Sequence, residues 1–278
     1  MKRVIVFLFI AGLSTMFASG QRREDRSSSG LKSEVRSVSG FSGIDASSVF
    51  NITVAKGNSE SLTIEADEAI MQYVRSEVRN GVLHLYLDRG AERTTRNIRT
   101  LKAFVVMRDL ESVSLSGASS LTANDLFSPR QFTGECSGAS SIAVNVNTNS
   151  LKIEASGTGK IHLKANVVGD AALNVSGSSK IQGDLKANNV NFSSSGVGIV
   201  ELTGAANDIV IQISGTARIR AENFVVKKAT INSSGTGNVR INVTDAMTVN
   251  SSGASSITYK GSPSVTLNVS RASRVQQI

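Results

Sequence analysis

Hydrophobic and polar residues alternate with a period of two along most of the chain, and the alternation restarts about every nineteen residues. In the stretch 150–165, SLKIEASGTGKIHLKA, apolar side chains occupy positions 151, 153 and 155 with polar ones between them. After a break at 156–159, Ile161 and Leu163 again alternate with polar neighbours. This period indicates short strands with one buried face and one solvated face.

The break itself recurs as SGASSI, SGTGKI, SGSSKI, SGTARI and SGTGNV. It opens at nine serines: Ser116, Ser137, Ser156, Ser176, Ser195, Ser214, Ser234, Ser252 and Ser270. Successive serines are 21, 19, 20, 19, 19, 20, 18 and 18 residues apart. A repeat of this length is typical of a solenoid. The sequence therefore predicts coils of two short strands, joined at this motif as a corner.

Glycine at the second motif position fits a sharp corner, because it allows a positive φ or a close backbone approach without a steric cost. The predicted structural corners are Gly117, Gly138, Gly157, Gly177, Gly196, Gly215, Gly235 and Gly253. The ninth repeat has Arg271 at this position. We interpret this substitution as capping, because charge at the end of a stack discourages pairing with another molecule.

The predicted fold class is all-β, a single-stranded parallel β-helix with coils of 19–20 residues over 116–278. The general preference of parallel crossovers predicts a right-handed path. Residues 35–115 lack the motif and predict an irregular β-rich region that covers the first coil, since solenoids need covered ends. Within it, Asn80-Gly81 suits the type I′ turn of a hairpin, and DEAIMQYV suggests a short helical turn.

The first residues predict export rather than a place in the fold. Residues 1–20 combine Lys2 and Arg3, a short apolar run and a small-residue cleavage site, as in a secretory signal peptide. Residues 21–34 are charged and serine-rich, which predicts a flexible tether. No cysteine stands at the cleavage point and no later apolar run is long enough to span a bilayer. We expect a periplasmic, secreted or cell-surface protein that is not a lipoprotein.

Composition narrows the possible partners. The chain has a formal net charge of +8 and no tryptophan. A basic exported protein can meet anionic polysaccharides or other envelope components. Nucleic acid is not expected as a partner, because few aromatic side chains are available to stack on bases. The single cysteine, Cys136, has an inward phase and is predicted to be a small core residue.

Residues 39–87, SGFSGIDASSVFNITVAKGNSESLTIEADEAIMQYVRSEVRNGVLHLYL, are followed by serial SGxxxI units. This combination resembles the putative auto-transporter adhesin head GIN domain family, exported β-helix proteins of Bacteroidetes-like bacteria. The resemblance extends over about residues 38–260. It implies a β-helix with an adhesin role, and it brings no catalytic residues with it.

The search for chemistry gives no predicted catalytic, metal or cofactor-binding residue. Enzymes on β-helices need carboxylates or bases that converge on one face. The outward acids after residue 150 share no stripe as a pair; they are Glu154, Asp170, Asp184, Glu201, Asp208, Glu222 and Asp245. His84 and His162 are alone in their segments, and both are predicted to face solvent. The sequence therefore predicts a protein that is not an enzyme and needs no cofactor.

Two outward surfaces remain as candidate sites. One is a flat polar face of threonine and asparagine ladders. The other, called the basic stripe below, contains six cations: Lys160, Lys180, Arg218, Arg220, Arg240 and Arg274. The same repeat positions contain one acid, Glu201. The basic stripe is either a surface for anionic glycans or a generic solvated face.

These features predict a non-enzymatic exported protein that acts as an adhesin or as a cell-envelope interaction module. Two alternatives stay open: a scaffold that assembles through its flat face or its ends, and a carbohydrate-active lyase or hydrolase. The sequence leaves the ligand and the oligomeric state undetermined.

Overall fold

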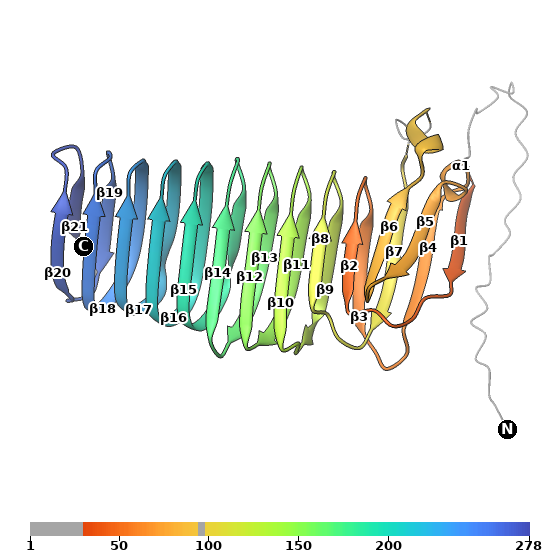
Figure 1. Ribbon diagram of the computed structural model, residues 1–278, viewed down its shortest axis with the longest axis horizontal. Helices are drawn as coiled ribbons and strands as arrows, with labels where there is room; N and C mark the ends of the chain where they lie inside the picture. The colour runs from red at the N-terminus through yellow and green to blue at the C-terminus, as the bar shows by residue number, and fades with distance from the viewer. Residues whose placement is uncertain (1–29, 94–97) are drawn as a thin grey trace, which may run out of the picture.

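The computed structural model describes residues 30–93 and 98–278, and within these ranges the chain forms one elongated parallel β-solenoid (Figure 1). The predicted signal peptide, residues 1–20, and most of the predicted tether lie outside the described residues. The predicted all-β parallel fold with coils of about nineteen residues is confirmed.

Most strands of the described residues are short, and the four long ones, β15 to β18, lie in the second half of the solenoid. The elements are β1 (Leu31–Arg36), β2 (Gly43–Ala46), β3 (Asn51–Lys56), β4 (Ser61–Asp67), α1 (Glu68–Met71), β5 (Val74–Arg79), β6 (Val82–Leu87), η1 (Arg89–Arg93), β7 (Leu101–Met107), β8 (Ser112–Leu115), β9 (Ser120–Phe127), β10 (Gln131–Cys136), β11 (Ser141–Thr148), β12 (Ser150–Ala155), β13 (Lys160–Val167), β14 (Asp170–Val175), β15 (Lys180–Ser194), β16 (Val197–Ile213), β17 (Thr216–Ser233), β18 (Thr236–Ser251), β19 (Ser256–Lys260), β20 (Ser264–Val269) and β21 (Arg274–Gln277).

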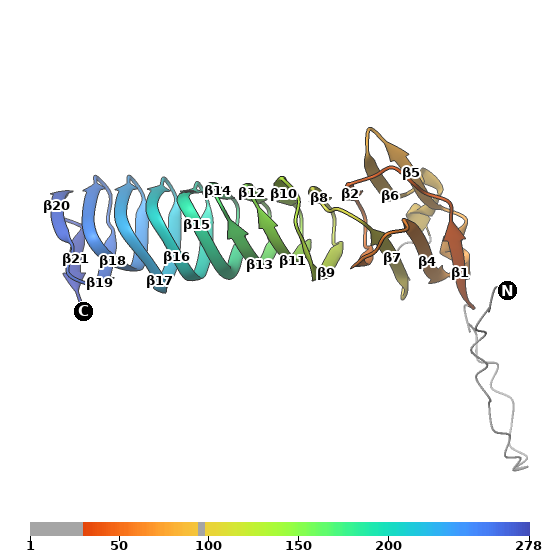
Figure 2. The same cartoon turned by 90° about the horizontal axis from the view of Figure 1, so that it is seen from below.

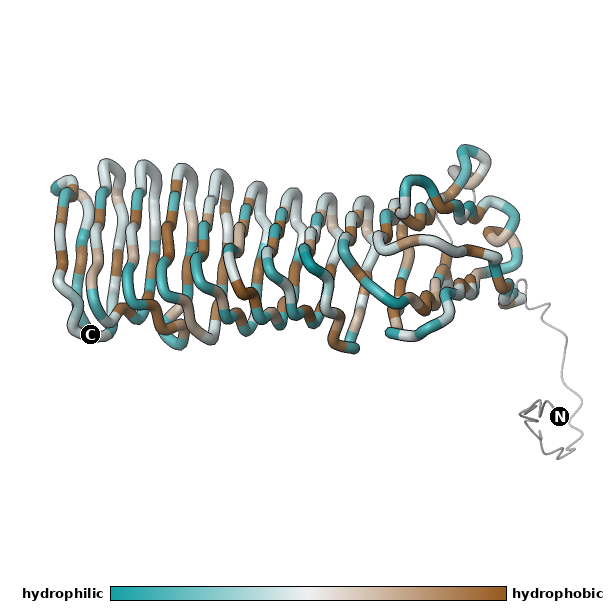
Figure 3. The backbone as a smooth tube through the Cα atoms, turned by 60° about the horizontal axis from the view of Figure 1, so that its bottom comes forward, coloured by the Kyte–Doolittle hydropathy of each residue, from teal (hydrophilic) through white to brown (hydrophobic). Residues whose placement is uncertain are grey.

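Each coil contributes one strand to each of two faces (Figure 2). The β13 face stacks β3, β9, β11 and β13 in parallel, and the β14 face stacks β2, β8, β10, β12 and β14. In β15 to β18 one strand runs round both faces: the first part of β15, 180–186, pairs with β13, and its second part, 189–194, pairs with β14. The hydropathy of the tube alternates along every coil (Figure 3), so apolar side chains point between the faces.

Register turns this alternation into columns of core residues. On the β14 face, Ile153 is aligned with Leu173, and Leu173 with Phe192. On the β13 face, Ile142, Ile161 and Ile181 are aligned in the same way. All six side chains are buried. Because the coils are in register, each apolar side chain packs on its counterpart in the next coil, which provides the burial that one coil cannot supply alone.

The parallel stack begins before the first SGxxxI motif. Strands β2 and β3 form a coil whose corner contains Ser48, and this coil lies directly against the one that contains Gly117. Ser48 has a φ of 86°, so a serine takes the left-handed conformation that glycines take at the next corners. The predicted boundary at 115/116 is therefore no structural break, because the motif search depended on a glycine that this corner lacks.

A set of added elements closes the amino-terminal end of the solenoid. Helix α1 buries Ile70 and Met71 there, as the predicted helical turn suggested, and β5 and β6 form the predicted hairpin with positive φ at Asn80 and Gly81. Strand β1 pairs antiparallel with β4 and begins at Leu31. The predicted tether, 21–34, is thus corrected at its end, since its last residues pair as an edge strand.

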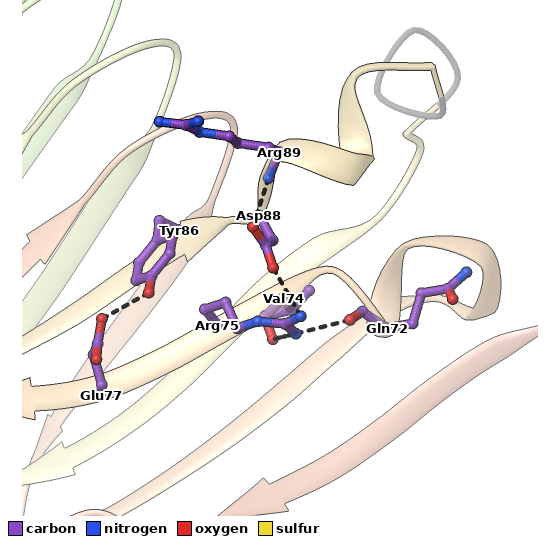
Figure 4. A network of polar contacts seen from close by, with 7 residues as sticks. All are labelled: Gln72, Val74, Arg75, Glu77, Tyr86, Asp88 and Arg89. Atoms are coloured by element: carbon purple, nitrogen blue, oxygen red, sulfur yellow. Dashed lines mark hydrogen bonds and ion pairs between the residues drawn. The ribbon is translucent and has the colours of Figure 1, made fainter.

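Polar contacts join the two arms of the hairpin and tie it to the end of α1 (Figure 4). The Arg75 guanidinium donates to Asp88 at 3.0 Å and to the carbonyl of Gln72 at 2.8 Å. The Tyr86 hydroxyl donates to Glu77 at 2.7 Å, and this hydrogen bond lowers the pKa of the Glu77 carboxyl and raises the pKa of the tyrosine. These contacts lie at the solvent-facing side of the hairpin, and they fix the closing elements.

The carboxy-terminal end carries no comparable cover among the described residues. In the last coil β20 pairs only with β18, and β21 pairs only with β19. Leu267 continues the core column of Val249, which is fully buried, yet Leu267 is 47% exposed. Leu267 therefore lies in the inward-facing column, but among the described residues no further coil covers it.

Candidate functional site

The basic stripe lies on the outer surface of the β13 face, in two neighbouring rows. In the first row Lys160 and Lys180 are aligned on adjacent coils, and Arg218 and Arg274 follow along the same row. The second row aligns Arg220 with Arg240. Coils are about 4.8 Å apart, so cations on adjacent coils are separated by about that distance at the backbone. The fold brings all six predicted residues onto one face.

Two acidic side chains form ion pairs with three of the six cations of the basic stripe. Glu201 lies between Lys180 and Arg220 and forms an ion pair of 2.8 Å with each. Glu222 forms a longer pair, 3.4 Å, with Arg240. Sequence reasoning counted only Glu201 as an acid of the stripe. It placed Glu222 among the outward acids but outside the stripe, because Glu222 lies eight residues after its motif serine. Arg240 lies six residues after the next motif serine, so the two side chains meet diagonally between adjacent coils, where the register of β17 shifts.

The Glu201 carboxylate stays ionised over a wide pH range. The hydrogen bond from Lys180 lowers its pKa, and the Arg220 guanidinium lowers it further. Lys160, Arg218 and Arg274 form no ion pair with any side chain in the part of the chain that the structure describes. The charge available to an anionic ligand is therefore concentrated on the first row.

The β14 face carries a second candidate, a shallow groove beside the corners of the later coils. Its volume is about 560 Å³, and its lining combines hydroxyls and side-chain amides, with Gln212, Asn232, Asn250 and Asn268 on successive coils. The amide of Asn250 donates to Asn232 at 2.9 Å, and the amide of Asn268 donates to Asn250 at 3.0 Å. This confirms a ladder of stacked asparagines, whose neutral groups offer hydrogen bonds without charge.

A smaller groove of about 330 Å³ lies beside the corners of the earlier coils and contains two carboxylates. Glu135 of β10 and Glu154 of β12 are aligned on adjacent coils. Glu154 also forms a 3.1 Å ion pair with Lys152. The prediction that no two acids share a stripe compared only residues after 150, and the aligned pair that it missed has one member, Glu135, before that point.

The histidines and the cysteine have ordinary structural surroundings. His162 is exposed as predicted, but His84 is half-buried and its Nδ1 lies 2.9 Å from a carboxylate oxygen of Asp45. The prediction of a lone solvent-facing His84 is therefore wrong, because β2 stacks beside β6 and brings Asp45 to it. Ser114 is aligned on the far side of Asp45, so the histidine does not lie between acid and serine as a catalytic triad requires.

Cys136 is 2% exposed, and burial raises the pKa of its thiol, as expected for a core residue. Among the described residues no group of three His, Cys, Asp or Glu side chains is placed to hold a metal ion. No described helix is long and apolar enough to cross a membrane.

Comparison with known proteins agrees with this architecture. The structure resembles that of a putative adhesin from Parabacteroides merdae, with a TM-score of 0.70 and 21% identity over 90% of this chain and 97% of that one. A putative adhesin from Parabacteroides distasonis has a TM-score of 0.68 and 19% identity over 90% of this chain and 98% of that one. A putative lipid binding protein from Parabacteroides distasonis has a TM-score of 0.70 and 17% identity over 90% of this chain and 98% of that one. These likenesses establish the fold.

No curated relative matches the sequence. The family described as putative auto-transporter adhesin, head GIN domain, matches it over residues 40–169 and again over 165–263. Together the two matches include most of the chain, from the first coil to the last but one. The protein belongs to this adhesin head family.

Proposed function

We propose that the protein is an exported, non-enzymatic adhesin-type protein that binds anionic polysaccharide or another anionic polymer of a cell envelope. Membership in an adhesin head family supports a role at a surface. The observation that carries the choice of ligand is the first row of the basic stripe, with Lys160, Arg218 and Arg274 unpaired among the described side chains.

A straight row of cations suits a linear polymer better than a small anion. The unpaired cations of the first row, Lys160, Arg218 and Arg274, are exposed to solvent rather than set in a pocket, so one contact contributes little, on the order of 1 kcal/mol or less. A polymer that lies along the solenoid contacts several cations at once, and their contributions accumulate. Such binding weakens as salt rises, because exposed charges are screened within about 10 Å at moderate ionic strength.

The test compares two double charge reversals with the same change in net charge. Lys160→Glu with Arg218→Glu reverses two of the three unpaired cations of the first row. Arg130→Glu with Lys228→Glu changes two exposed cations outside the β13 face. We expect the first variant to lose about tenfold or more in affinity for polygalacturonate at low salt, and the second to keep most of it. Equal losses, or no binding of polygalacturonate by the native protein, would overturn the proposal.

A second candidate function follows from Glu135 and Glu154. Retaining glycoside hydrolases place two carboxylates about 5 Å apart on either side of the scissile bond, and aligned residues on adjacent coils lie at about this spacing. Incubation of the native protein with acidic and neutral polysaccharides tests this candidate. New reducing ends that disappear in both Glu135→Gln and Glu154→Gln support hydrolysis, and an absence of new reducing ends contradicts it.

A further inference from the structure

The first and last strands of the described solenoid differ in the side chains at their inward-facing positions. At the amino-terminal end, β1 is an edge strand whose Lys32, Glu34 and Arg36 are aligned with the core residues Ala66, Ile64 and Leu62 of β4. Glu34 forms ion pairs with Lys32 at 2.8 Å and with Arg36 at 2.6 Å. Charges at positions that point toward the core are a known protection of edge strands against pairing with another chain.

At the carboxy-terminal end the same positions are apolar and open. Val265, Leu267 and Val269 of β20 continue core columns, and they are 37%, 47% and 37% exposed. Their counterparts one coil earlier, Met247 and Val249, are buried. The outer edges of β20 and β21 have no partner strand among the described residues. An apolar row beside two unpaired edges is what an internal coil presents to the next coil.

We propose that this end is an association surface for the same end of a second copy, which gives a closed tail-to-tail dimer. Arg271, interpreted above as a cap, lies at the corner between β20 and β21, so its charge does not interrupt the apolar row of β20. The partner must offer two strand edges at the same level, with apolar side chains between them. The amino-terminal end of another copy is unsuitable, because β1 and α1 cover it. The carboxy-terminal end of another copy has both edges and the apolar row.

The symmetry of this contact follows from the two faces. The twofold axis of the dimer is perpendicular to the two faces. It places β20 beside β20 of the second copy, and β21 beside β21 of the second copy, and both pairs are antiparallel. The β14 faces of the two copies then continue each other, and so do the β13 faces. Because the contact is isologous, it closes at two copies and does not extend into a filament.

Charge sets the salt dependence of the dimer. The last coil carries Lys260, Arg271 and Arg274, and residues 246–278 contain no acid. Antiparallel pairing brings the corner with Arg271 toward the corner of the second copy that follows Lys260, so like charges approach. Salt screens this repulsion. The dimer should therefore strengthen as salt rises, whereas binding of a polyanion to the basic stripe should weaken.

Analytical ultracentrifugation over a range of protein and salt concentrations tests the dimer. The native protein should form a concentration-dependent dimer that is favoured by salt. Leu267→Lys with Val269→Lys, which imitates the charged pattern of β1, should raise the dimer Kd about a hundredfold or more. Leu267 and Val269 are already exposed, and circular dichroism checks that this variant is folded. The control Val35→Lys, at a position 78% exposed on β1, should leave the Kd unchanged.

A spin label fixes the orientation of the two copies. Labels on Thr266→Cys should give a short distance between copies, and labels on Ser33→Cys should give none within range. Cys136 is buried and does not compete for the label. A monomer at all protein and salt concentrations overturns the proposal, as does a dimer that survives Leu267→Lys with Val269→Lys, or short distances from Ser33. None of these results bears on the polygalacturonate assay, so the two proposals fail separately.

Discussion

The early and late corners of the solenoid share one glycine position but not one conformation. Gly117, Gly138, Gly157 and Gly177 have φ values of 64–70°. Gly196, Gly215, Gly235 and Gly253 are absent from the positive-φ residues of the described chain. At both kinds of corner a Cβ would lie against backbone of the preceding coil, 2.5 Å from Gly157 O at Gly177 and 2.4 Å from Gly196 O at Gly215. Close stacking, rather than φ, is the common reason for glycine.

A shift of one hydroxyl accompanies the change in conformation. In three of the four early corners a buried serine stands three residues after the motif serine, with Gly159 as the exception, and Ser179 donates to the carbonyl of Ser176 at 2.8 Å, which closes a tight turn. Ala217 stands at that position in a late corner. Three of the four late corners bury a serine just before the motif, at 194, 233 and 251. The corner of Gly253 also keeps a buried serine three residues after its motif serine, but this residue, Ser255, lies 2.7 Å from Ser233 of the preceding coil. The two corner types therefore use different hydrogen bonds to reach the same stacking distance.

The largest expected effect comes from an early corner. Gly177→Ala places a methyl group on the Gly157 carbonyl and also forces a left-handed residue, which costs about 1–2 kcal/mol by itself. We expect the free energy of unfolding to fall by about 3 kcal/mol in total. Urea denaturation measures it. Arg271→Ala, at the same motif position in the open last coil, is the control and should change stability little.

A smaller loss is expected at a late corner. Gly215→Ala meets the Gly196 carbonyl at nearly the same distance but without left-handed strain. Its loss should exceed about 1 kcal/mol and remain below that of Gly177→Ala. If the two variants lose the same stability, the difference in φ between the corner types has no energetic consequence.

The hydroxyl explanation has its own test. Ser179→Ala removes a buried hydrogen bond and should cost about 1 kcal/mol. The reverse change, Ala217→Ser, should not stabilise the late corner, because that corner is not closed by this turn. Thermal unfolding of both variants gives the comparison, and a gain of stability in Ala217→Ser contradicts it.

Charge pairing provides the smallest effect. Glu201→Gln breaks two exposed ion pairs in the later coils, so stability at neutral pH should fall by less than about 1 kcal/mol. Since the folded pKa of Glu201 lies below its unfolded value, the ionised group stabilises the fold at neutral pH, and this stabilisation disappears as the pH falls through the acidic range. The variant should also bind polygalacturonate more tightly than the native protein, because Lys180 and Arg220 lose their acid.

The repeat allowed the fold to be predicted, because corner glycines and alternating side chains are local signals that recur. What was missed depends on contacts between coils. Ser48 forms a corner without glycine, and the φ of Gly196 differs from that of Gly177 although both lie in the same motif. The basic stripe could be predicted from phase alone. The ion pair of Glu222 with Arg240 could not, because the two residues have different phases in their repeats and meet diagonally between adjacent coils.

The direction of the interstrand hydrogen bonds has a mechanical consequence. Between coils these bonds run along the solenoid axis, so a pull between its two ends loads them in tension. Since each coil is held only by its neighbours, force peels the open end first and then releases the coils one after another. Each release would lengthen the chain by one repeat of 18–21 residues. Such a molecule, anchored at one end and loaded at the other, would absorb force in equal steps rather than by one abrupt failure.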